Sequence, residues 1–409
     1  MERLFSAALG VEAPWFVKSA EFNVEAKRLD IWLEFKRGSR FGLTRDAGQE
    51  EVLCPVHDTV EKTWRHLNFF EHECHLHARV PRVETPEGRV VMVLPPWAGK
   101  LAGFTLLFEA LLLKLCKHMP VDNVSKMTGV SNFKLWRMLD LYVAQARDGA
   151  DWSGIPAVGM DETSIAKGHD YITLFVDTCE RKTLFVTEGK DHKTVEAFAE
   201  EMKENNAVPE QITDVSCDMS PAFIKGVKAY LPNAQVTFDK FHILKILGEA
   251  VDSVRRNEAK TNPLLKGTRY IFLKNDANLT EKQRAKKREL ALSELNLDTM
   301  RALQMRETFQ QLYAAETTET FTHNLRKWVA WVADCGLHAM EKAAETIVNH
   351  WDGIVAWKKS QLNNGILEGL NSVVQAAKRK ARGYKAHHFT TIAYLLTAKL
   401  DFKSVNRFA

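Results

Sequence analysis

The sequence predicts an α/β fold: a mixed sheet with helices on both faces, an all-α insertion, and two smaller modules that precede them. Three observations predict it. Three strand-like apolar segments follow one another within residues 155–188, strands then alternate with helical segments through residue 256, and residues 257–350 carry almost no strand signal. Three adjacent strands followed by alternating helices and strands are the element order of the ribonuclease-H-like fold.

The composition is typical of a soluble globular protein. The chain has 409 residues, of which 45% are hydrophobic and 26% charged, enough for two or three domains. A net charge of +4 is compatible with a nucleic-acid partner, although many enzymes share it. The six cysteines show no pairing pattern, no signal peptide is recognisable, and the longest apolar stretch is interrupted by Glu109 and Lys114. We therefore expect a reduced, cytoplasmic protein with no membrane partner.

Residues 1–98 are predicted to form a small β-rich module. The segments 22–26 and 29–35 alternate apolar and polar side chains, as the two strands of a half-buried hairpin do. Pro95 and Pro96 end this module, because consecutive prolines favour a linker over a helix or a strand.

A helix-turn-helix is predicted within residues 99–150. Gly129 can form a tight turn, and Ser131 is a good N-cap for a second helix. Apolar residues recur at helical spacing before the turn, at Val121, Val124 and Met127. The buried side of the second helix is expected to carry Phe133, Leu135, Trp136, Leu139 and Val143.

An ordinary corner between two helices would produce the same pattern. The start of the second helix favours DNA binding instead, because Asn132, Lys134 and Arg137 lie where they could reach base edges and phosphates.

The central α/β domain is expected to comprise residues 151–256 and to resume at 351–409 after the helical insertion. The predicted elements are, in order, strands at 155–160, 171–177 and 183–188, a helix at 194–203, a strand at 212–217, a helix at 221–231, a strand at 234–238 and a helix at 240–256.

Two aspartates follow strands of this predicted sheet. Asp161 comes after the first strand and Asp218 after the fourth. Side chains just beyond strand ends of an open α/β sheet point into the crevice where ligands bind. A single aspartate at a strand end is more often a turn-forming residue, so the hypothesis depends on the pairing of the two and on a third group.

Glu368 is the candidate third group. It begins a helix whose apolar stripe consists of Leu367, Leu370, Val374, Ala377 and Ala381. The adjacent stripe comprises Glu368, Asn371, Gln375, Lys378, Arg379 and Arg382. A metal-binding acid followed by a phosphate-binding track suits a site that cuts nucleic acid. The alternative is a solvated amphipathic helix, but such a face usually mixes both charges, and no acid follows Glu368 here.

Three carboxylates would suit Mg²⁺ or Mn²⁺, which prefer hard oxygen ligands. Two such ions can activate the attacking oxygen and stabilise the leaving oxygen of an in-line phosphoryl displacement. The sequence contains no P-loop, so nucleotide hydrolysis is not favoured.

These motifs resemble those of the DDE transposases of bacterial insertion sequences, specifically the ISL3 group. The resemblance is carried by GMDETSIAKGHDYITLFVD around Asp161, VSCDMSPAFIKGVKAYLPNAQVTFDKFHI around Asp218 and NGILEGLNSVVQAAKRKARGY around Glu368. It extends to WRHL at 64–67, VPRV at 80–83, PPWA at 95–98 and the helix-turn-helix.

The resemblance implies that Asp161, Asp218 and Glu368 are a catalytic triad that binds two Mg²⁺ or Mn²⁺ ions. The spacings are 218 − 161 = 57 and 368 − 218 = 150, the second being long because the helical insertion lies within it. Asp239 and His242 also match a family motif, which implies that they lie near the site and support it or contact DNA.

The resemblance also implies a zinc-ribbon-like unit in the N-terminal module, in degenerate form. Cys54 and His57 match the first ligand pair, the second expected pair is absent, and Cys74 with His77 offers a substitute. Four such ligands would suffice for structural Zn²⁺. The segment that holds the substitute pair resembles a strand, in which side chains three positions apart point to opposite faces, so a metal-free module is the favoured alternative.

The function implied is that of a transposase that binds the terminal inverted repeats of its own element, cleaves DNA to free a 3′-hydroxyl and transfers it to target DNA. Both element ends and target are double-stranded DNA, and at least a homodimer is expected in the active complex. A bacterial, nucleoid-associated protein is expected. The residues expected to hold the phosphate backbone are Lys378, Arg379, Lys380, Arg382 and Lys385. Two alternatives remain: a transposase-derived DNA-binding regulator without catalysis, and a nuclease of the same fold that only hydrolyses DNA.

Overall fold

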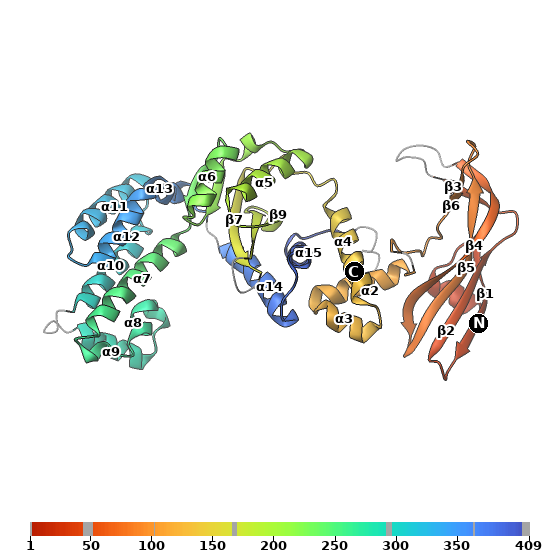
Figure 1. The fold of residues 1–409 in the computed structure, drawn as a ribbon, viewed down its shortest axis with the longest axis horizontal. Helices are drawn as coiled ribbons and strands as arrows, with labels where there is room; N and C mark the ends of the chain where they lie inside the picture. The colour runs from red at the N-terminus through yellow and green to blue at the C-terminus, as the bar shows by residue number, and fades with distance from the viewer. Residues whose placement is uncertain are drawn as a thin grey trace. The chain divides into compact units, whose positions relative to one another are not determined.

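The computed structural model describes residues 2–43, 52–101, 103–165, 170–291, 297–362 and 365–402. The chain divides into two compact units (Figure 1). The first contains Met1–Asp148 with Leu400–Ala409, and the second contains Gly149–Lys399. Among the helices described, none has the length and apolar character needed to cross a membrane.

The first unit opens with a six-stranded sheet. Its strands run in the order β1-β2-β5-β4-β3, with β6 paired to β5. The elements are α1 (Glu2–Leu9), β1 (Trp15–Asn23), β2 (Arg28–Phe35), β3 (Arg40–Leu43), β4 (Val52–Phe69), β5 (His72–Glu84) and β6 (Val90–Met92). A hairpin is present, but its first strand differs from the prediction: β1 ends at Asn23, so most of the predicted segment 22–26 is the turn. β1 and β2 are antiparallel, and every second residue of β2 is buried, at Leu29, Ile31 and Leu33.

Three helices follow in the same unit: α2 (Leu106–His118), α3 (Val121–Thr128) and α4 (Asn132–Arg147). The predicted turn between α3 and α4 is confirmed. Gly129 adopts a left-handed conformation with φ 72°, and its N–H donates to the Ser125 carbonyl. The Ser131 hydroxyl accepts from the Lys134 N–H, as expected of an N-cap.

Two apolar residues of this region are not buried, contrary to expectation. The side chain of Met127 is 57% exposed and that of Phe133 is 70% exposed. The buried face of α4 is formed by Leu135, Met138, Leu139, Tyr142 and Val143. At about 100° per residue, Phe133 lies about 200° from Leu135 around the helix, so it faces away from this core.

A buried carboxylate joins α2 to α4. Glu109 accepts hydrogen bonds from the N–H groups of Lys100 at 2.9 Å and Leu101 at 2.7 Å, and from the Tyr142 hydroxyl at 2.6 Å. Burial raises the pKa of Glu109. A Cβ added to Gly99 would lie 2.5 Å from the Glu109 carboxyl carbon, so the chain can pass this close only with glycine there.

The second unit contains a five-stranded sheet in the order β11-β10-β7-β8-β9. Strands β7, β8 and β9 are antiparallel, whereas β10 pairs parallel with both β7 and β11. The predicted mixed sheet is therefore present. Its elements are β7 (Ala157–Ser164), β8 (Tyr171–Asp177), β9 (Lys182–Glu188), α5 (His192–Glu204), β10 (Asp214–Cys217), α6 (Pro221–Tyr230), β11 (Gln235–Phe238), α14 (Gly365–Ala381) and α15 (Ala386–Thr397).

Helices cover both faces of this sheet (Figure 1). On one face, Phe175 of β8 stacks on Phe198 of α5 with ring centroids 4.4 Å apart, and its cross-strand partner is Met160. Neighbouring residues of a strand point to opposite faces, so Gly159 and Asp161 face the other side, where α14 packs. The faces of β7 therefore have different roles: one is core and the other carries polar groups.

Every element described between residues 257 and 350 is helical, as predicted. α7 (Lys240–Glu258) leaves the sheet after β11 and leads into this part of the chain. The helices that follow are α8 (Arg269–Leu273), α9 (Glu281–Ala291), α10 (Asp298–Leu312), α11 (Thr318–Ala333), α12 (His338–Asn349) and α13 (Trp351–Ser360).

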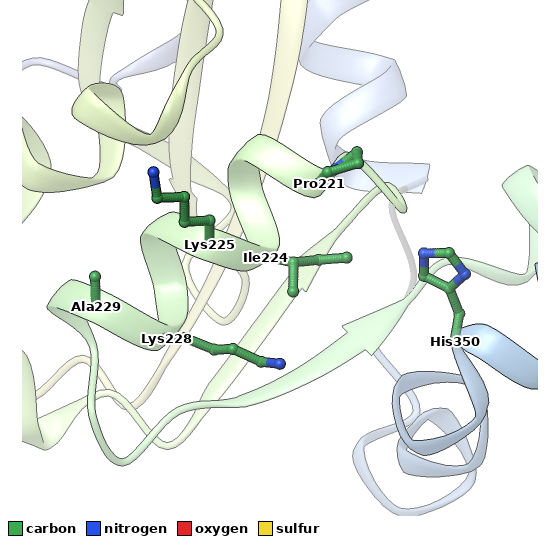
Figure 2. Close-up of a pocket in the computed structure, with 6 residues that line it drawn as sticks. All are labelled: Pro221, Ile224, Lys225, Lys228, Ala229 and His350. Atoms are coloured by element: carbon green, nitrogen blue, oxygen red, sulfur yellow. The ribbon is translucent and has the colours of Figure 1, made fainter.

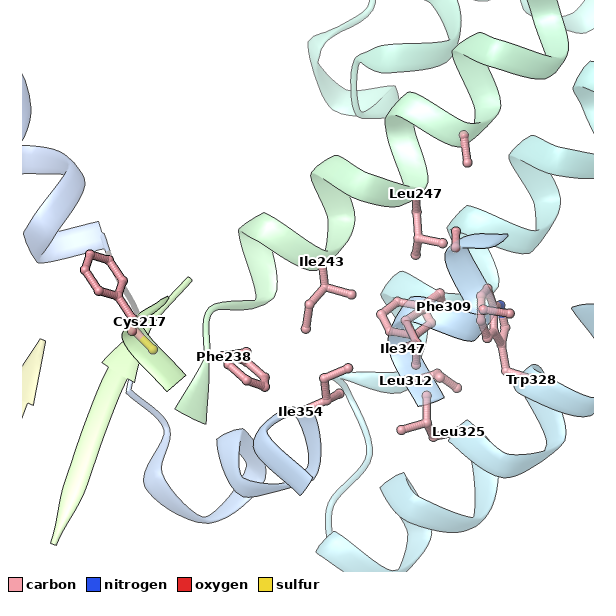
Figure 3. Packing of buried hydrophobic residues seen from close by; sticks show 14 of the residues in the cluster. Cys217, Phe238, Ile243, Leu247, Phe309, Leu312, Leu325, Trp328, Ile347 and Ile354 are labelled. Atoms are coloured by element: carbon pink, nitrogen blue, oxygen red, sulfur yellow. The ribbon is translucent and has the colours of Figure 1, made fainter. Parts of the chain in front are cut away.

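The helical part shares one hydrophobic core with the sheet. Ile243 and Leu247 of α7 point toward Phe309 and Ile347 of the helices that follow (Figure 3). α13 packs closely on β11, because a Cβ added to Gly353 would lie 2.4 Å from the Phe238 ring. This continuous core fixes the helical part to the strands that carry the candidate site.

Candidate active site

The two aspartates lie side by side on neighbouring strands. β10 pairs parallel with β7, and the last paired residues are Ser216 and Gly159. Two positions further along each strand come Asp218 and Asp161, and neighbouring strands lie about 4.8 Å apart. One detail differs from expectation: Asp161 lies within β7, which continues to Ser164 because it remains paired with β8, whereas Asp218 follows the end of β10.

Negative charge accumulates at this point of the sheet. Burial, together with the charges of Glu162 and Asp218, raises the pKa of Asp161 to about 7. Burial and the charge of Asp218 also raise the pKa of Glu162. Sequence reasoning did not identify Glu162, although its position directly after Asp161 was the available signal. Among the described residues these three carboxylates do not form a common cluster, but their charges raise the pKa of Asp161 and Glu162, and the combined negative charge favours a positive charge nearby.

His242 supplies a cationic group beside these acids. Its pKa is raised by interaction with Asp239 and by the charge of Asp161, and its own charge lowers the pKa of Asp161. Asp239 is fully buried and caps α7 by accepting from the Phe241 N–H at 3.3 Å. Its other oxygen lies 3.7 Å from His242 Nδ1, which is longer than a normal hydrogen bond. This motif therefore places a histidine within electrostatic range of the paired aspartates.

α14 is attached to the polar face of β7 near Asp161. The Asn371 amide donates to Asp161 Oδ2 at 2.7 Å. One turn earlier, Leu367 packs against Gly159, where an added Cβ would lie 2.8 Å from a Leu367 methyl group. Glycine at this position lets the helix approach the strand closely, and the approach brings Asn371 within reach of the carboxylate.

Polar side chains extend this attachment along β7. Gln375 donates to the Thr163 hydroxyl at 2.7 Å and to the Ser164 carbonyl at 2.8 Å. Lys378 donates to the same carbonyl at 2.6 Å. Asn371, Gln375 and Lys378 were expected to contact DNA, but the structure engages all three with the strand. The reason is that the polar stripe of α14 faces the sheet over this length.

Glu368 is exposed at the start of α14. In the part of the chain that the structure describes, no group of three or more His, Cys, Asp or Glu side chains is arranged to hold a metal ion. The structure thus brings Asp161 and Asp218 together but does not place Glu368 in a common cluster with them. Glu368 precedes Asn371 by three residues, a rise of about 4.5 Å along the helix axis.

Comparison with known families decides the class of protein. Residues 158–393 match the model of the DDE transposase domain of the ISL3 family, described as a transposase. Residues 93–143 match the helix-turn-helix domain of transposase family ISL3. The chain belongs to the ISL3 family of transposases. It is therefore a DNA transposase, an enzyme that cleaves and transfers DNA strands, and the helix-turn-helix prediction is confirmed.

Two named relatives agree with this assignment. The transposase for insertion sequence element IS1001 of Bordetella parapertussis is 26% identical over 82% of this chain and 84% of its own length. The transposase for insertion sequence element IS1557 of Mycobacterium tuberculosis is 25% identical over 97% of this chain and 95% of its own length.

Membership of a DDE transposase family implies use of a divalent metal ion, and the two aspartates that the structure brings together are donors of the right kind. Both are carboxylates, the hard oxygen donors that Mg²⁺ and Mn²⁺ prefer. One oxygen of Glu162 and the Asn371 carbonyl oxygen are buried without a hydrogen-bond partner. Buried oxygens without a hydrogen-bond partner, next to a carboxylate of raised pKa, can bind a cation.

The remaining residues predicted to contact DNA fall into two groups. Beyond the attached part of α14, four cations are exposed, namely Arg379, Lys380, Arg382 and Lys385. The helix ends among them, where Arg382 and Gly383 both adopt positive φ. On α4 of the helix-turn-helix, the Asn132 amide donates to Asp122, Lys134 lies over the buried Phe104 ring, and Arg137 lies over an exposed phenylalanine ring.

The four residues considered for zinc do not converge. Cys74 of β5 lies opposite His66 of β4, whereas Cys54 comes 66 − 54 = 12 positions earlier in β4. Twelve residues of strand span about 40 Å. His57 lies near the Cys54 end and His77 near the Cys74 end, where it contacts Asp30 at 2.6 Å. These four residues therefore cannot form a single tetrahedral site in this structure, and both cysteines lie in the hydrophobic core of the sheet.

Two hollows lie elsewhere on the second unit. One, of about 530 Å³, is lined by Pro221, Ile224, Lys225, Lys228, Ala229 and His350 (Figure 2). Another, of about 800 Å³, shares Ile224, Lys228 and His350 with it and extends along β11 and α13. Neither is lined by Asp161, Asp218 or Glu368, so the carboxylates are not part of either hollow.

Proposed function

We propose that this transposase recognises the terminal inverted repeats of its own insertion sequence, frees a 3′-hydroxyl by cleavage and joins that hydroxyl to target DNA. The names of its relatives support the proposal, because both are transposases for insertion sequence elements. Two element ends must be joined, so a homodimer or larger assembly is proposed as the active form.

A ribonuclease-H-like fold is proposed for the catalytic part. Support comes from the strand order, in which three antiparallel strands are followed by two strands parallel to the first. The proposed domains are an N-terminal module at 1–98, a DNA-binding helix-turn-helix at 99–150, a catalytic domain at 151–256 and 351–409, and the helical insertion at 257–350.

Asp161, Asp218 and Glu368 are proposed as the catalytic acids, holding two Mg²⁺ or Mn²⁺ ions. The observation that carries this proposal is the juxtaposition of Asp161 and Asp218 on β7 and β10, with α14 attached beside them through Asn371. Because Glu368 begins that same helix, a shift of α14 by about one turn on binding DNA would bring its carboxylate to the pair.

Bound divalent ions would activate the attacking oxygen and stabilise the leaving oxygen of the phosphoryl displacement. Asn371 holds the Asp161 carboxylate in one orientation by its hydrogen bond. His242 places a positive charge beside the same carboxylates, where the scissile phosphate would lie. The exposed cations at the end of α14 would hold the phosphate backbone leading away from the site.

Replacement of Asp161 by asparagine tests the proposal. With Mg²⁺ and a duplex that carries an element end, wild-type protein is expected to nick the end and to give strand-transfer products on a gel. Asp161→Asn should lose both activities and bind the end nearly as tightly, because it removes a metal-binding charge without changing α4. Asp214→Asn, at the opposite end of β10, is the matched control and should retain activity.

The same gels separate the two alternative functions. A regulator without catalysis would bind the end but produce no Mg²⁺-dependent nick. A nuclease would nick without joining strands. Cleavage by Asp161→Asn at the wild-type rate would remove Asp161 from the catalytic set.

A further inference from the structure

The start of α4 presents an exposed aromatic residue paired with an arginine. Phe133 is 70% exposed, and the Arg137 guanidinium lies over its ring, 5.7 Å from the centroid. Residues four positions apart share one face of a helix, so both project from the side of α4 opposite to its buried residues. Single exposed apolar side chains are common on protein surfaces, so a binding role is indicated by the pairing of Phe133 with Arg137 at the start of the second helix and not by exposure alone.

The other residues at this end of α4 are engaged with the protein. The Asn132 amide donates to Asp122 at 2.6 Å. The Lys134 ammonium lies over the Phe104 ring, 5.5 Å from its centroid. Asn132 and Lys134 are both expected to reach DNA, but the Asn132 amide has a hydrogen-bond partner within the unit and the Lys134 ammonium lies over a buried ring, whereas Arg137 lies over an exposed one. Phe133 and Arg137 thus form an exposed pair at this helix end, on the side of α4 opposite to its buried residues.

The chemistry of the pair matches one feature of the DNA major groove. Apolar side chains read the 5-methyl group of thymine, and arginine donates two hydrogen bonds to O6 and N7 of guanine. A guanidinium stacked on a ring keeps its N–H donors in its own plane, free for such a contact. The N-terminal residues of the second helix of a helix-turn-helix are the ones that meet base edges.

We propose that Phe133 and Arg137 act as one reading unit, with the Phe133 ring against a thymine methyl group and the Arg137 guanidinium on the guanine of the neighbouring base pair. This inference rests on the proposed binding of element ends by the helix-turn-helix. It predicts that a thymine–guanine step within the terminal repeat determines specificity at that position. Phe133 and Arg137 are specificity residues here and take no part in the chemistry of strand cleavage.

Removal of thymine methyl groups tests the first half of the pair. The probe is a fluorescent duplex of the element end, made with thymine or with uracil, which differs only by the methyl group. Wild-type full-length protein is expected to bind the uracil duplex about fourfold more weakly, the effect of one buried methyl group. Phe133→Ala should bind the thymine duplex more weakly by a similar factor and should not distinguish the two duplexes. Single uracil substitutions then locate the thymine.

A matched control comes from the same unit. Phe70 is 85% exposed, like Phe133, but lies between β4 and β5 rather than on α4. Phe70→Ala should retain the wild-type ratio between thymine and uracil duplexes. Phe133→Leu keeps an apolar side chain and should therefore retain part of the wild-type ratio between thymine and uracil duplexes. A purely structural role of Phe133 would not require this result.

Replacement of guanine by 7-deazaguanine, which lacks the N7 acceptor, tests the second half. Wild-type affinity should fall about tenfold at one guanine adjacent to the located thymine, and Arg137→Ala should be insensitive to that change. If the thymine sensitive to loss of its methyl group and the guanine sensitive to loss of N7 are not neighbours, the proposed joint role of Phe133 and Arg137 is wrong.

Failure of this inference and failure of the proposed function give different results. If the wild type shows no preference for the element end over an unrelated duplex, end recognition itself is wrong. If the wild type prefers the end but binds thymine and uracil duplexes equally, or if Phe133→Ala weakens both equally, only the reading role of Phe133 is overturned.

Discussion

At the scale of single residues, Asp161 shows how its surroundings fit a carboxylate to a cation. Burial and the neighbouring charge of Glu162 raise its pKa to about 7, and Asn371 holds one of its oxygens. A buried carboxylate with a fixed orientation is stabilised more by a bound cation than a solvated carboxylate is. The cation offsets both the repulsion from neighbouring carboxylates and the cost of desolvation. His242 compensates only part of that charge.

His66 makes the stability of the first unit depend on pH. It is largely buried, its Nδ1 lies 2.9 Å from the Thr105 hydroxyl, and burial with the charge of Arg65 lowers its pKa from 6.5 to about 4. Between pH 6.5 and 4 the unfolded chain takes up a proton at His66 and the folded chain does not. Acidification through this window should therefore reduce the free energy of unfolding, by up to about 3 kcal/mol.

The measurement is urea unfolding followed by tryptophan fluorescence at several pH values. His66→Gln should flatten the loss of stability between pH 6.5 and 4 relative to the wild type. His57→Gln, an exposed histidine on the same strand, serves as the control and should keep the wild-type slope. An unchanged slope in His66→Gln would show that His66 does not carry this dependence.

At the scale of elements, the candidate site depends on how closely α14 approaches β7. The approach is possible because residue 159 has no side chain, and an added Cβ would meet Leu367 at 2.8 Å. Gly159→Val should push α14 away from the strand, lengthen the contact between Asn371 and Asp161, and separate Glu368 further from the aspartates. We expect a loss of cleavage of about tenfold or more, the usual effect of disturbing groups that orient metal ligands.

End binding and cleavage should respond differently to this change, because the helix-turn-helix lies in the other unit. Affinity for the end duplex should remain within about twofold of the wild type, whereas nicking in Mg²⁺ should fall. Gly154→Val is the matched control, since a Cβ at Gly154 meets nothing within 4 Å. Equal cleavage by the two valine variants would show that the approach of α14 does not matter.

Most of the helices and strands can be predicted from the sequence, because the patterns that indicate them are local. Alternation predicted the hairpin of β1 and β2, and Gly129 with Ser131 predicted the turn between α3 and α4. The exposure of Phe133 was missed because its apolar character suggested burial, although its angle to Leu135 on the helix would have shown otherwise.

At the scale of the whole molecule, the contacts that the sequence does not predict are those between distant segments. Helical periodicity predicts that the polar stripe of α14 is an exposed, DNA-binding face. It cannot show that Asn371 and Gln375 of this stripe contact β7, which lies more than 200 residues earlier in the sequence. Likewise, the resemblance offers four zinc ligands, with a metal-free module as the favoured alternative, and the register of β4 and β5 separates Cys54 from Cys74. The register of paired strands and the packing of a helix on a sheet depend on the whole hydrophobic core. A local sequence pattern carries no information about that core.

The requirement for two element ends leads to a prediction about the whole assembly. If each copy of the chain cleaves one end, a dimer with one wild-type copy and one Asp161→Asn copy should cleave one end and give no product with both ends joined. Such dimers can be purified with two different tags after co-expression. Relative to the wild-type dimer, single-end cleavage should fall to about half, because closed symmetric dimers hold two equivalent sites.

A control dimer that pairs wild type with Asp214→Asn should give both kinds of product at wild-type levels. Two-ended products from the mixed Asp161→Asn dimer would mean that one copy of the chain serves both ends. The distinction is physical: one site can act on two ends only in succession, so the DNA would have to be released and rebound, or the site moved, between the two cleavages. A dimer with two fixed sites needs neither step, and its two-ended activity must disappear when either Asp161 is lost.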